Sequence, residues 1–554
     1  MTRIEYKPGK VWENYHKTEK IWVEQEGTYE SDLGSNSAND LSGPDRFAAT
    51  ASPLFDFVAK AKTMATGAGM LGIGWSFAPL IGMPRLQLDL QKLSGCSPAH
   101  ADELSKRCPY PIEDIAFVSG GTNLRTIVEW AKPRGKMMFT SGTHLAPTIA
   151  GGAGTSTHGS RLGYGGLQNQ IIGMHIITGD NSSVWLERRS RPVLKRKIAK
   201  KFADRSIRSD KMFEDALIHL GGMGIINGVA LELTDYKTFH VLADDHALWP
   251  DWLAQMRDGD FRAIARELGH DAEPTFYEVT INPANYMGPQ ALHTCYFEKD
   301  ADADGTDVKD TDAKGTKSSP DAFTALKRPA DAICHICEPQ NHKSTDGINI
   351  DPDNLTPDFN LLALYAAEFF DEHKPPINTA SPGRGWEDIH DDVITGGSAG
   401  ALYNASYAVD RRQIDKVIPL ICKAVEHIPA TFIFTMRFVS QPTGTLAFTR
   451  FAETVVIEID GISENAPDFG QALGQFTRTA SLIVREALDA AGIDYSMHWA
   501  KLGEVDAGKI ERDFGPSSLS GSRISRWRET RNKLLQDDCK SVFWNRALRN
   551  YGLV

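Results

Sequence analysis

The chain has 554 residues, of which 41% are hydrophobic and 24% charged, and its formal net charge is −12. These values are ordinary for globular proteins, and the length suggests two or more domains that each contain their own core. The acidic balance leaves no general basic surface, so we expect neither nucleic acid nor anionic lipid as a partner.

Cysteine usage and hydropathy predict a cytoplasmic protein. The seven cysteines are scattered and odd in number, which argues against a disulfide framework and for a reducing compartment. The N-terminus has no apolar signal-peptide core, and nowhere does a run of apolar residues reach the length of a membrane span. Cys334 and Cys337 have metal-ligand spacing, but no second pair accompanies them, so we expect no metal site.

The first 240 residues alternate predicted helices and strands with glycine at the corners. Residues 52–66 have helical spacing of apolar positions and end at glycine, and residues 69–77 follow as a strand that runs into a tight loop. A strand, a glycine turn and a helix closed by Gly135 come next. A helix, a glycine turn and a strand follow over 211–234. This pattern predicts an α/β domain over residues 1–240.

The pattern changes after residue 240. Strands are predicted at 276–283, 431–440 and 453–461, and helices at 359–371, 413–428 and 468–491. The acidic, low-complexity segment 299–320 has the composition of a surface loop. We therefore expect a second domain of antiparallel α+β character over 241–500, followed by a C-terminal segment, 501–554, that contains a charged helix. The fold class as a whole is predicted to be α+β.

Residues 142–166 contain eight glycines, with small hydroxyl side chains between them. Because glycine has no Cβ and reaches positive φ freely, this segment can let the backbone approach a ligand closely. Exposed N–H groups and hydroxyls suit a large anionic or planar cofactor. A flexible linker fits poorly, since the segment continues directly into the apolar, strand-like sequence IIGMHIITG.

The sequence also contains Gly67-Ala-Gly69-Met-Leu-Gly72, which matches the dinucleotide fingerprint G-x-G-x-x-G. That motif requires a strand before it and a helix after it, so that the pyrophosphate meets the helix N-terminus. Here the predicted order is reversed, with a helix before the glycines and a strand among them. We therefore do not expect an NAD-binding fold.

Four segments in a fixed order carry a family resemblance: GIGWSFAPL (72–80), SGGTNLRTIVEW (119–130), TIAGGAGTSTHGSRLGYGGLQNQIIGMHIITGD (148–180) and LGGMGIINGVALEL (220–233). They resemble the flavin-binding segments of the vanillyl-alcohol oxidase, or p-cresol-methylhydroxylase-type, FAD-linked oxidoreductase family. TSTHGS, the terminal HWAKL and the N-terminal WENYHKTEKIWV look most like its aldonolactone, alditol and sterol oxidase branch. The resemblance implies an FAD-binding domain of two α/β subdomains, plus a substrate domain with a mainly antiparallel sheet flanked by helices.

The resemblance also implies which residues bind FAD. In this fold the pyrophosphate lies among the backbone N–H groups of two glycine loops, which compensate its charge without Lys or Arg. The matching positions in this chain are Gly72, Ile73, Gly74, Trp75, Ser76, Thr148, Gly151, Gly152, Thr155, Ser156, Thr157, His158, Gly159, Gly222, Gly224 and Ile225.

One position departs from the family. Many relatives place a histidine just before the serine of the first loop and bond it covalently to the flavin, whereas this chain has Trp75 there. Indole cannot form that bond, so we predict FAD held without a covalent link. His158 is the nearby residue that could attach the flavin instead, although ordering of the loop by hydrogen bonds fits it better.

The resemblance gives candidate catalytic residues as well. Arg437 matches an arginine of the branch, but the acidic residue expected two positions earlier is Thr435. Glu458 on the neighbouring strand could supply the carboxylate, because side chains of adjacent strands reach one another. Lys501 of HWAKL matches a lysine kept near the flavin, where a cation stabilises anionic reduced flavin or an alkoxide. His498 could act as a base at neutral pH.

These residues also have ordinary structural interpretations. Arg437 could be a surface ion-pair partner, Glu458 could lie on the solvent face of an alternating strand, and His498 could be a packed histidine.

The predicted activity is oxidation of a CH–OH group by hydride transfer to flavin N5, which also needs a group that takes the hydroxyl proton. Small alcohols, polyols, sugar lactones or sterol-like molecules are the expected substrates, and dioxygen is the expected electron acceptor. A dehydrogenase with another acceptor, an enzyme of specialised metabolism that oxidises C–N or C–C bonds, and an FAD-binding protein without catalysis are the alternatives.

Overall fold

The computed structural model describes residues 2–33, 41–81, 85–244, 250–283, 286, 291–300, 355, 385–389, 399–466 and 470–554. The helix predicted at 359–371, the pair Cys334 and Cys337, and the acidic segment beyond Asp300 lie outside these ranges. The structure is 33% helical and 29% strand, which confirms a mixed helix-and-sheet class. None of the described helices combines the length and apolar character that a membrane span requires.

The N-terminus forms a four-stranded sheet of order β1-β2-β4-β3. Its strands are β1 (Thr2–Glu13), β2 (Lys20–Ser31), β3 (Gly69–Leu71) and β4 (Leu86–Asp89). The helix predicted at 52–66 is α1 (Gly43–Thr63) and begins nine residues earlier than expected. Ser42 caps it by accepting a hydrogen bond from Asp45 N at 3.3 Å, and Pro44 suits the first turn, where no N–H partner is needed.

A six-stranded sheet of order β10-β9-β8-β11-β6-β5 follows. Its strands are β5 (Cys96–Pro98), β6 (Ile115–Ser119), β8 (Ile171–Ile177), β9 (Ser183–Glu187), β10 (Arg205–Arg208) and β11 (Ile225–Glu232). Its helices are α2 (Leu124–Ala131), α3 (Ile149–Gly154), α4 (Arg196–Phe202) and α5 (Asp210–Leu217), and the short strands β7 (Lys136–Met137) and β12 (Thr234–Asp235) pair beside it. Gly135 ends the α2 region at φ 67°, as predicted.

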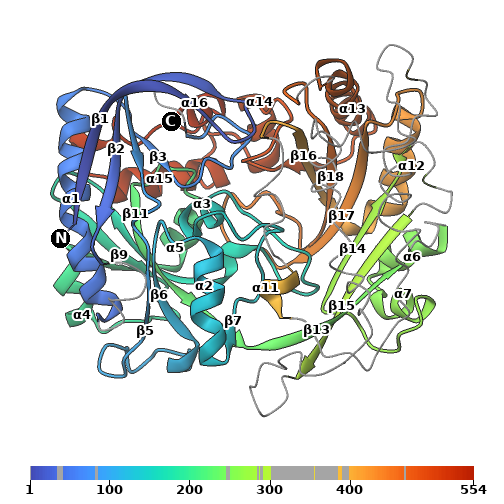
Figure 1. Cartoon of the computed structure of the whole chain (residues 1–554). Coiled ribbons are helices and arrows are strands. Elements are labelled where there is room, and N and C mark those ends of the chain that lie inside the picture. The colour runs from blue at the N-terminus through green and yellow to red at the C-terminus, as the bar shows by residue number, and fades with distance from the viewer. Residues whose placement is uncertain are drawn as a thin grey trace, which may run out of the picture.

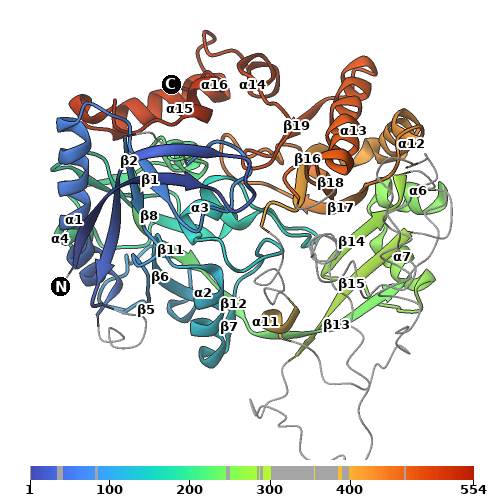
Figure 2. The same ribbon diagram turned by 45° about the horizontal axis from the view of Figure 1, so that its top comes forward.

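The remaining chain forms a seven-stranded sheet of order β13-β15-β14-β17-β18-β16-β19, antiparallel at every pairing. Its strands are β13 (Lys237–Asp244), β14 (Phe276–Ile281), β15 (Ala291–Asp300), β16 (Leu402–Asp410), β17 (Phe432–Ser440), β18 (Glu453–Ile462) and β19 (Tyr495–Met497). Helices cover one face (Figures 1 and 2): α6 (Pro250–Asp258), α7 (Phe261–Glu267), α12 (Ile414–Val425) and α13 (Gly470–Ala490). The short α11 (Trp386–Ile389) lies near β13.

The two faces of this sheet differ in chemistry because side chains alternate along each strand. Val279, Met436, Ile457 and similar residues point to the helices and form a second hydrophobic core. The opposite face carries polar residues at the alternating positions of four adjacent strands: Glu278 and Thr280, Thr435 and Arg437, Glu458 and Asp460, and Asn404 and Ser406. We call this set the polar wall.

The C-terminal segment runs back to the N-terminal sheets (Figure 1). Its helices are α14 (Ala507–Phe514), α15 (Arg523–Leu534) and α16 (Arg546–Asn550). Trp527 Nε1 donates to Ile218 O at 2.9 Å, and Arg531 Nε donates to Gly222 O at 2.9 Å. These contacts fix the tail against the turn that precedes β11. The boundaries at 240 and 500 stay a prediction.

Candidate active site

A cavity of about 250 Å³ lies between the N-terminal sheets and the polar wall. Its lining comes from the loop after β3, the glycine-rich segment around α3, the turn before β11, the polar wall and the start of the C-terminal tail. The part of the lining that residues 70–226 contribute contains no Asp, Glu, Lys or Arg. The cavity therefore has one half without Asp, Glu, Lys or Arg side chains and another half that is strongly charged.

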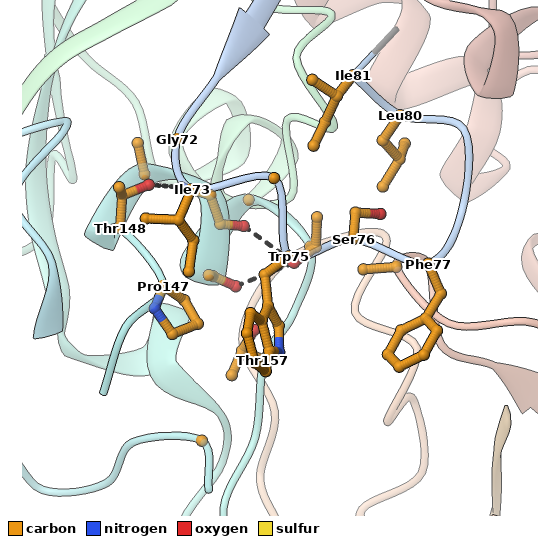
Figure 3. A pocket seen from close by; sticks show the side chains of 18 of the residues that line it. Gly72, Ile73, Trp75, Ser76, Phe77, Leu80, Ile81, Pro147, Thr148 and Thr157 are labelled. Atoms are coloured by element: carbon orange, nitrogen blue, oxygen red, sulfur yellow. Dashed lines mark hydrogen bonds between the residues drawn. The ribbon is translucent and has the colours of Figure 1, made fainter. Parts of the chain in front are cut away.

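The loop after β3 forms one side of the uncharged half (Figure 3). Gly74 has φ 72°, a conformation that favours glycine and turns the chain sharply. Carbonyl groups of the loop point outward, since Gly74 O accepts from Tyr15 N at 3.2 Å and Ser76 O accepts from Asn14 Nδ2 at 2.7 Å. Within the described chain, the N–H groups of residues 73–76 have no hydrogen-bond acceptor. These donors remain for a ligand.

The start of α3 faces this loop from the opposite side. Thr148 caps the helix by accepting from Gly151 N at 3.3 Å, and Thr155 Oγ1 donates to Gly151 O at 2.9 Å. A Cβ on Gly72 would lie 2.8 Å from Thr148 Oγ1, so the two segments approach as closely as they do only because residue 72 is glycine. Figure 3 shows Pro147, Thr148 and Thr157 on the wall beside Ile73 and Trp75.

The structure brings most of the predicted cofactor residues to this one cavity. Those that line it are Gly72, Ile73, Gly74, Trp75, Ser76, Thr148, Gly151, Gly152, Thr155, Thr157, His158, Gly224 and Ile225.

Three predicted cofactor residues lie outside the lining. Ser156 is buried at φ 63°, and its Oγ accepts from Gln168 Nε2 at 3.4 Å. Gly159 packs against Thr140, and Gly222 packs against the ring of Trp527. Neighbouring residues line the cavity, but these three residues contact other parts of the protein instead.

Trp75 lies in an aromatic cluster at the cavity. Its ring stacks on Tyr15 with centroids 4.7 Å apart and lies 5.3 Å from the ring of His144. His144 also lines the cavity, so His158 is not the only imidazole near the predicted flavin site. The sequence reasoning missed His144 because it lies in the glycine-rich segment ahead of the positions matched to the family.

The charged half centres on Glu458, which is 2% exposed. Arg437 Nη1 and Lys501 Nζ both pair with this carboxylate, the lysine at 3.6 Å, and Ser406 Oγ donates to it at 3.2 Å. Arg437 Nε also donates to Glu278 Oε2 at 3.0 Å. Burial disfavours the charged form of Glu458, but the charges of Arg437 and then Lys501 outweigh burial and hold its pKa below the ordinary value.

This geometry overturns the ordinary interpretations of Arg437 and Glu458. Neither side chain is a solvated surface group, because the solvent face expected for β18 is instead the buried wall of a cavity. Glu458 stands directly opposite Thr435 in the β17–β18 register, so it occupies the space beside the position where the branch has its acidic residue.

His498 also lines the cavity, and its hydrogen bonds fix its tautomer. Its Nδ1 accepts from Ala500 N at 3.0 Å. Burial, reinforced by the nearby Lys501 charge, lowers the pKa of His498 well below the ordinary value, so the ring is neutral at pH 7. A neutral ring with an accepting Nδ1 carries its proton on Nε2. His498 is therefore arranged as a hydrogen-bond donor, and the role of base expected for it is not supported.

His158 has the complementary arrangement. Its Nδ1 donates to Gly159 O at 3.0 Å, which leaves Nε2 without a proton in the neutral ring. Burial lowers the pKa of His158 to about 4. The ring centroids of His158 and His498 lie 5.9 Å apart.

Two residues of the charged half escaped the sequence reasoning. Asp460 and Asn404 are buried at 4% and 3% exposure and line the cavity, and Asn404 Nδ2 donates to Asp460 Oδ1. The available signal was the pattern VVIEID, in which two acidic residues at positions i and i+2 must share one face of a strand. Within the described residues, no group of three His, Cys, Asp or Glu side chains is arranged to hold a metal ion.

No family model matches the chain, and no curated protein matches its sequence. Its fold is similar to that of cholesterol oxidase from Brevibacterium sterolicum, with a TM-score of 0.61 and 12% identity over 99% of this chain and 97% of that one. A histidine-to-alanine mutant of that oxidase gives a TM-score of 0.60 at the same identity and coverage. The fold is also similar to that of 6-hydroxy-D-nicotine oxidase from Arthrobacter nicotinovorans, with a TM-score of 0.52 and 13% identity over 99% of this chain and 98% of that one.

These similarities cover 99% of the chain and confirm the predicted family resemblance, while the division of the FAD-binding domain into two subdomains stays a prediction. Both known enzymes are oxidases with the p-cresol-methylhydroxylase-type FAD-binding fold. At 12–13% identity the likeness defines the fold and leaves the reaction to be argued from the site.

Proposed function

We propose that this protein is an FAD-dependent oxidoreductase that oxidises a CH–OH group of a small molecule, with dioxygen as electron acceptor. The observation that carries the proposal is the two-sided cavity. Its uncharged half offers backbone N–H groups and no charged side chain, whereas its other half gathers Arg437, Lys501 and two carboxylates. A cofactor and a polar substrate can meet where the halves join.

The uncharged half fits FAD on its own features. The free N–H groups of residues 73–76 and the capped start of α3 can compensate the pyrophosphate, as backbone nests do in other phosphate sites. Gly72 keeps the space between the two segments clear of a Cβ atom, and Gly74 allows the positive φ at which the loop turns. Because Trp75 offers no nucleophile, FAD is expected to be bound without a covalent link.

Bound FAD supplies a hydride acceptor, and the charged half supplies the groups that handle the substrate oxygen. Lys501 and Arg437 place positive charge where negative charge develops as the hydroxyl proton leaves. Glu458 holds both cations in position through its ion pairs. The Nε2–H of His498 is a donor that can orient the substrate oxygen.

Oxidation of a C–N bond is the second candidate reaction. One of the similar structures is an oxidase named for an amine rather than an alcohol. This chain also has Thr435 where the branch has an acidic residue, and the missing carboxylate argues against the usual polyol substrate.

Anaerobic mixing of the purified protein with panels of alcohols and amines tests the proposal. We expect the flavin absorbance to bleach with one or more alcohols and to recover rapidly when air is admitted. Bleaching by amines alone would replace the CH–OH assignment, and slow recovery at the rate of free flavin would indicate a dehydrogenase. No bleaching with any compound would leave an FAD-binding protein without this catalysis.

A further inference from the structure

Oxidation of an alcohol needs a group that accepts the hydroxyl proton, and the cavity offers few acceptors. His498 presents an N–H. Glu458 is occupied by Arg437, Lys501 and Ser406. His158 has an unprotonated Nε2, but with a pKa of about 4 it is a weak base. Of the two described carboxylates in the lining, Glu458 and Asp460, only Asp460 has no ion pair within the described chain.

Asp460 differs from Glu458 in its partners. Within the described chain the ion pairs of the polar wall connect Arg437 to Glu278 and Glu458, and Lys501 to Glu458, and none reaches Asp460. Its contacts are the amide of Asn404 and the hydroxyl of Thr435, both uncharged. Three carboxylates thus share two cations, and Asp460 is the carboxylate without an ion pair.

The electrostatic surroundings of Asp460 place its proton affinity in a useful range. Burial raises its pKa, the neighbouring Glu458 charge raises it further, and Lys501, Arg437 and the Thr435 hydrogen bond oppose these effects, with a result of about 6. A base with such a pKa is ionised at pH 7 and binds a proton far more readily than an ordinary aspartate.

We propose that Asp460 is the catalytic base that removes the hydroxyl proton of the substrate. The inference rests on the proposed alcohol oxidation. The O–H bond breaks and its proton goes to an Asp460 carboxylate oxygen, while the C–H bond breaks and its hydride, with two electrons, goes to the bound flavin as the oxidant. The new C=O bond completes the product. Asp460 then releases its proton to solvent before the next cycle, and Lys501 and Arg437 stabilise the oxygen during the transfer.

The test compares the wild type with Asp460→Asn and with the exposed control Asp271→Asn. The amide oxygen that Asp460→Asn introduces can still accept from Asn404, so the fold is expected to persist. In stopped-flow experiments the wild-type and control rates of flavin reduction should rise with pH through about 6 and then level off. Flavin reduction in Asp460→Asn should be slower than in the wild type by at least roughly 100-fold, and its rate should no longer rise with pH.

A second readout does not depend on turnover. Infrared difference spectra of the substrate-free protein should show a protonated carboxyl that titrates near pH 6 in the wild type and is missing in Asp460→Asn. Asn404→Ala should move both this titration and the acid limb of the rate to higher pH, because the carboxylate loses a donor. If Asp460→Asn does not fold, the pH–rate profile of Asn404→Ala provides the test. An acid limb that moves to higher pH supports the proposal, and an acid limb at the wild-type pH overturns it.

The outcomes separate the two proposals. A wild-type protein that binds no flavin, or whose flavin no alcohol reduces, overturns the proposed function and with it the role of Asp460. Flavin reduction in Asp460→Asn at the wild-type rate, with an unchanged pH profile, overturns the role of Asp460 alone.

Discussion

Glu458 organises the charged half of the cavity at the scale of single residues. Its carboxylate joins a strand arginine and a tail lysine that lie 64 positions apart in the sequence. Removing one member of a buried ion pair leaves an uncompensated charge and typically costs about 3–5 kcal/mol. The sequence reasoning placed Arg437, Glu458 and Lys501 near one another because the family tail and the adjacent strands suggested it. It could not foresee that Arg437 would also bind Glu278, which depends on the pairing of β14 with β17.

Lys501→Met tests the role of the tail lysine. We expect flavin to remain bound, and its reduction by substrate to slow by about 100- to 1,000-fold, since loss of one preorganised electrostatic group costs about 2.7–4 kcal/mol of transition-state stabilisation. Stopped-flow absorbance at saturating substrate measures this step. The exposed Lys533→Met is the matched control and should behave as the wild type. Unchanged reduction in Lys501→Met would remove the assigned role.

At the scale of secondary structure elements, we expect the contact between the loop after β3 and the start of α3 to determine cofactor binding. Gly72→Ala would put a Cβ 2.8 Å from Thr148 Oγ1 and 2.9 Å from Thr148 Cγ2, so either the Thr148 side chain that caps α3 must move or the two segments must separate. We expect the dissociation constant for FAD, measured by quenching of flavin fluorescence, to rise tenfold or more.

Gly508→Ala is the control for this substitution. Gly508 lies exposed within α14, where alanine favours the helix, so FAD binding should not change. Equal affinities in Gly72→Ala and the wild type would show that the close approach at Thr148 does not shape the site.

The elements that the sequence predicted well have a clear local signal. Gly135 closes a helix, β6 and β8 are apolar runs with glycine at or near their C-terminal ends, and β11 is an apolar run that directly follows Gly224. The β1–β2 hairpin lacked such a signal, because β1 carries Pro8 and Gly9 among charged residues. In addition, the exposed Val11 and Trp22 are as apolar as their buried neighbours Trp12 and Val23, so apolar and polar residues do not alternate there. Asp460 was missed for a related reason: the sequence leaves open whether the polar face of β18 meets solvent or a site, and only tertiary packing shows that it meets a cavity.

The whole molecule brings the two halves of the cavity together through its C-terminal tail. Residues 498–501 complete the charged half, Phe77 N donates to Ala500 O at 2.8 Å, and α15 packs on the turn before β11. The C-terminal tail therefore contacts both the loop after β3 and the polar wall. The family motifs gave the order of the elements, but this closure arises from contacts between residues more than 300 positions apart, which no local pattern encodes.

Titration of flavin-free protein with FAD tests the central claim most directly, because the proposed function requires the uncharged half of the cavity to hold that cofactor. We predict saturable uptake of one FAD per chain, a yellow complex with a higher melting temperature, and release of all the flavin into the supernatant on acid precipitation. Correctly folded protein that stays colourless and takes up no FAD would contradict the account.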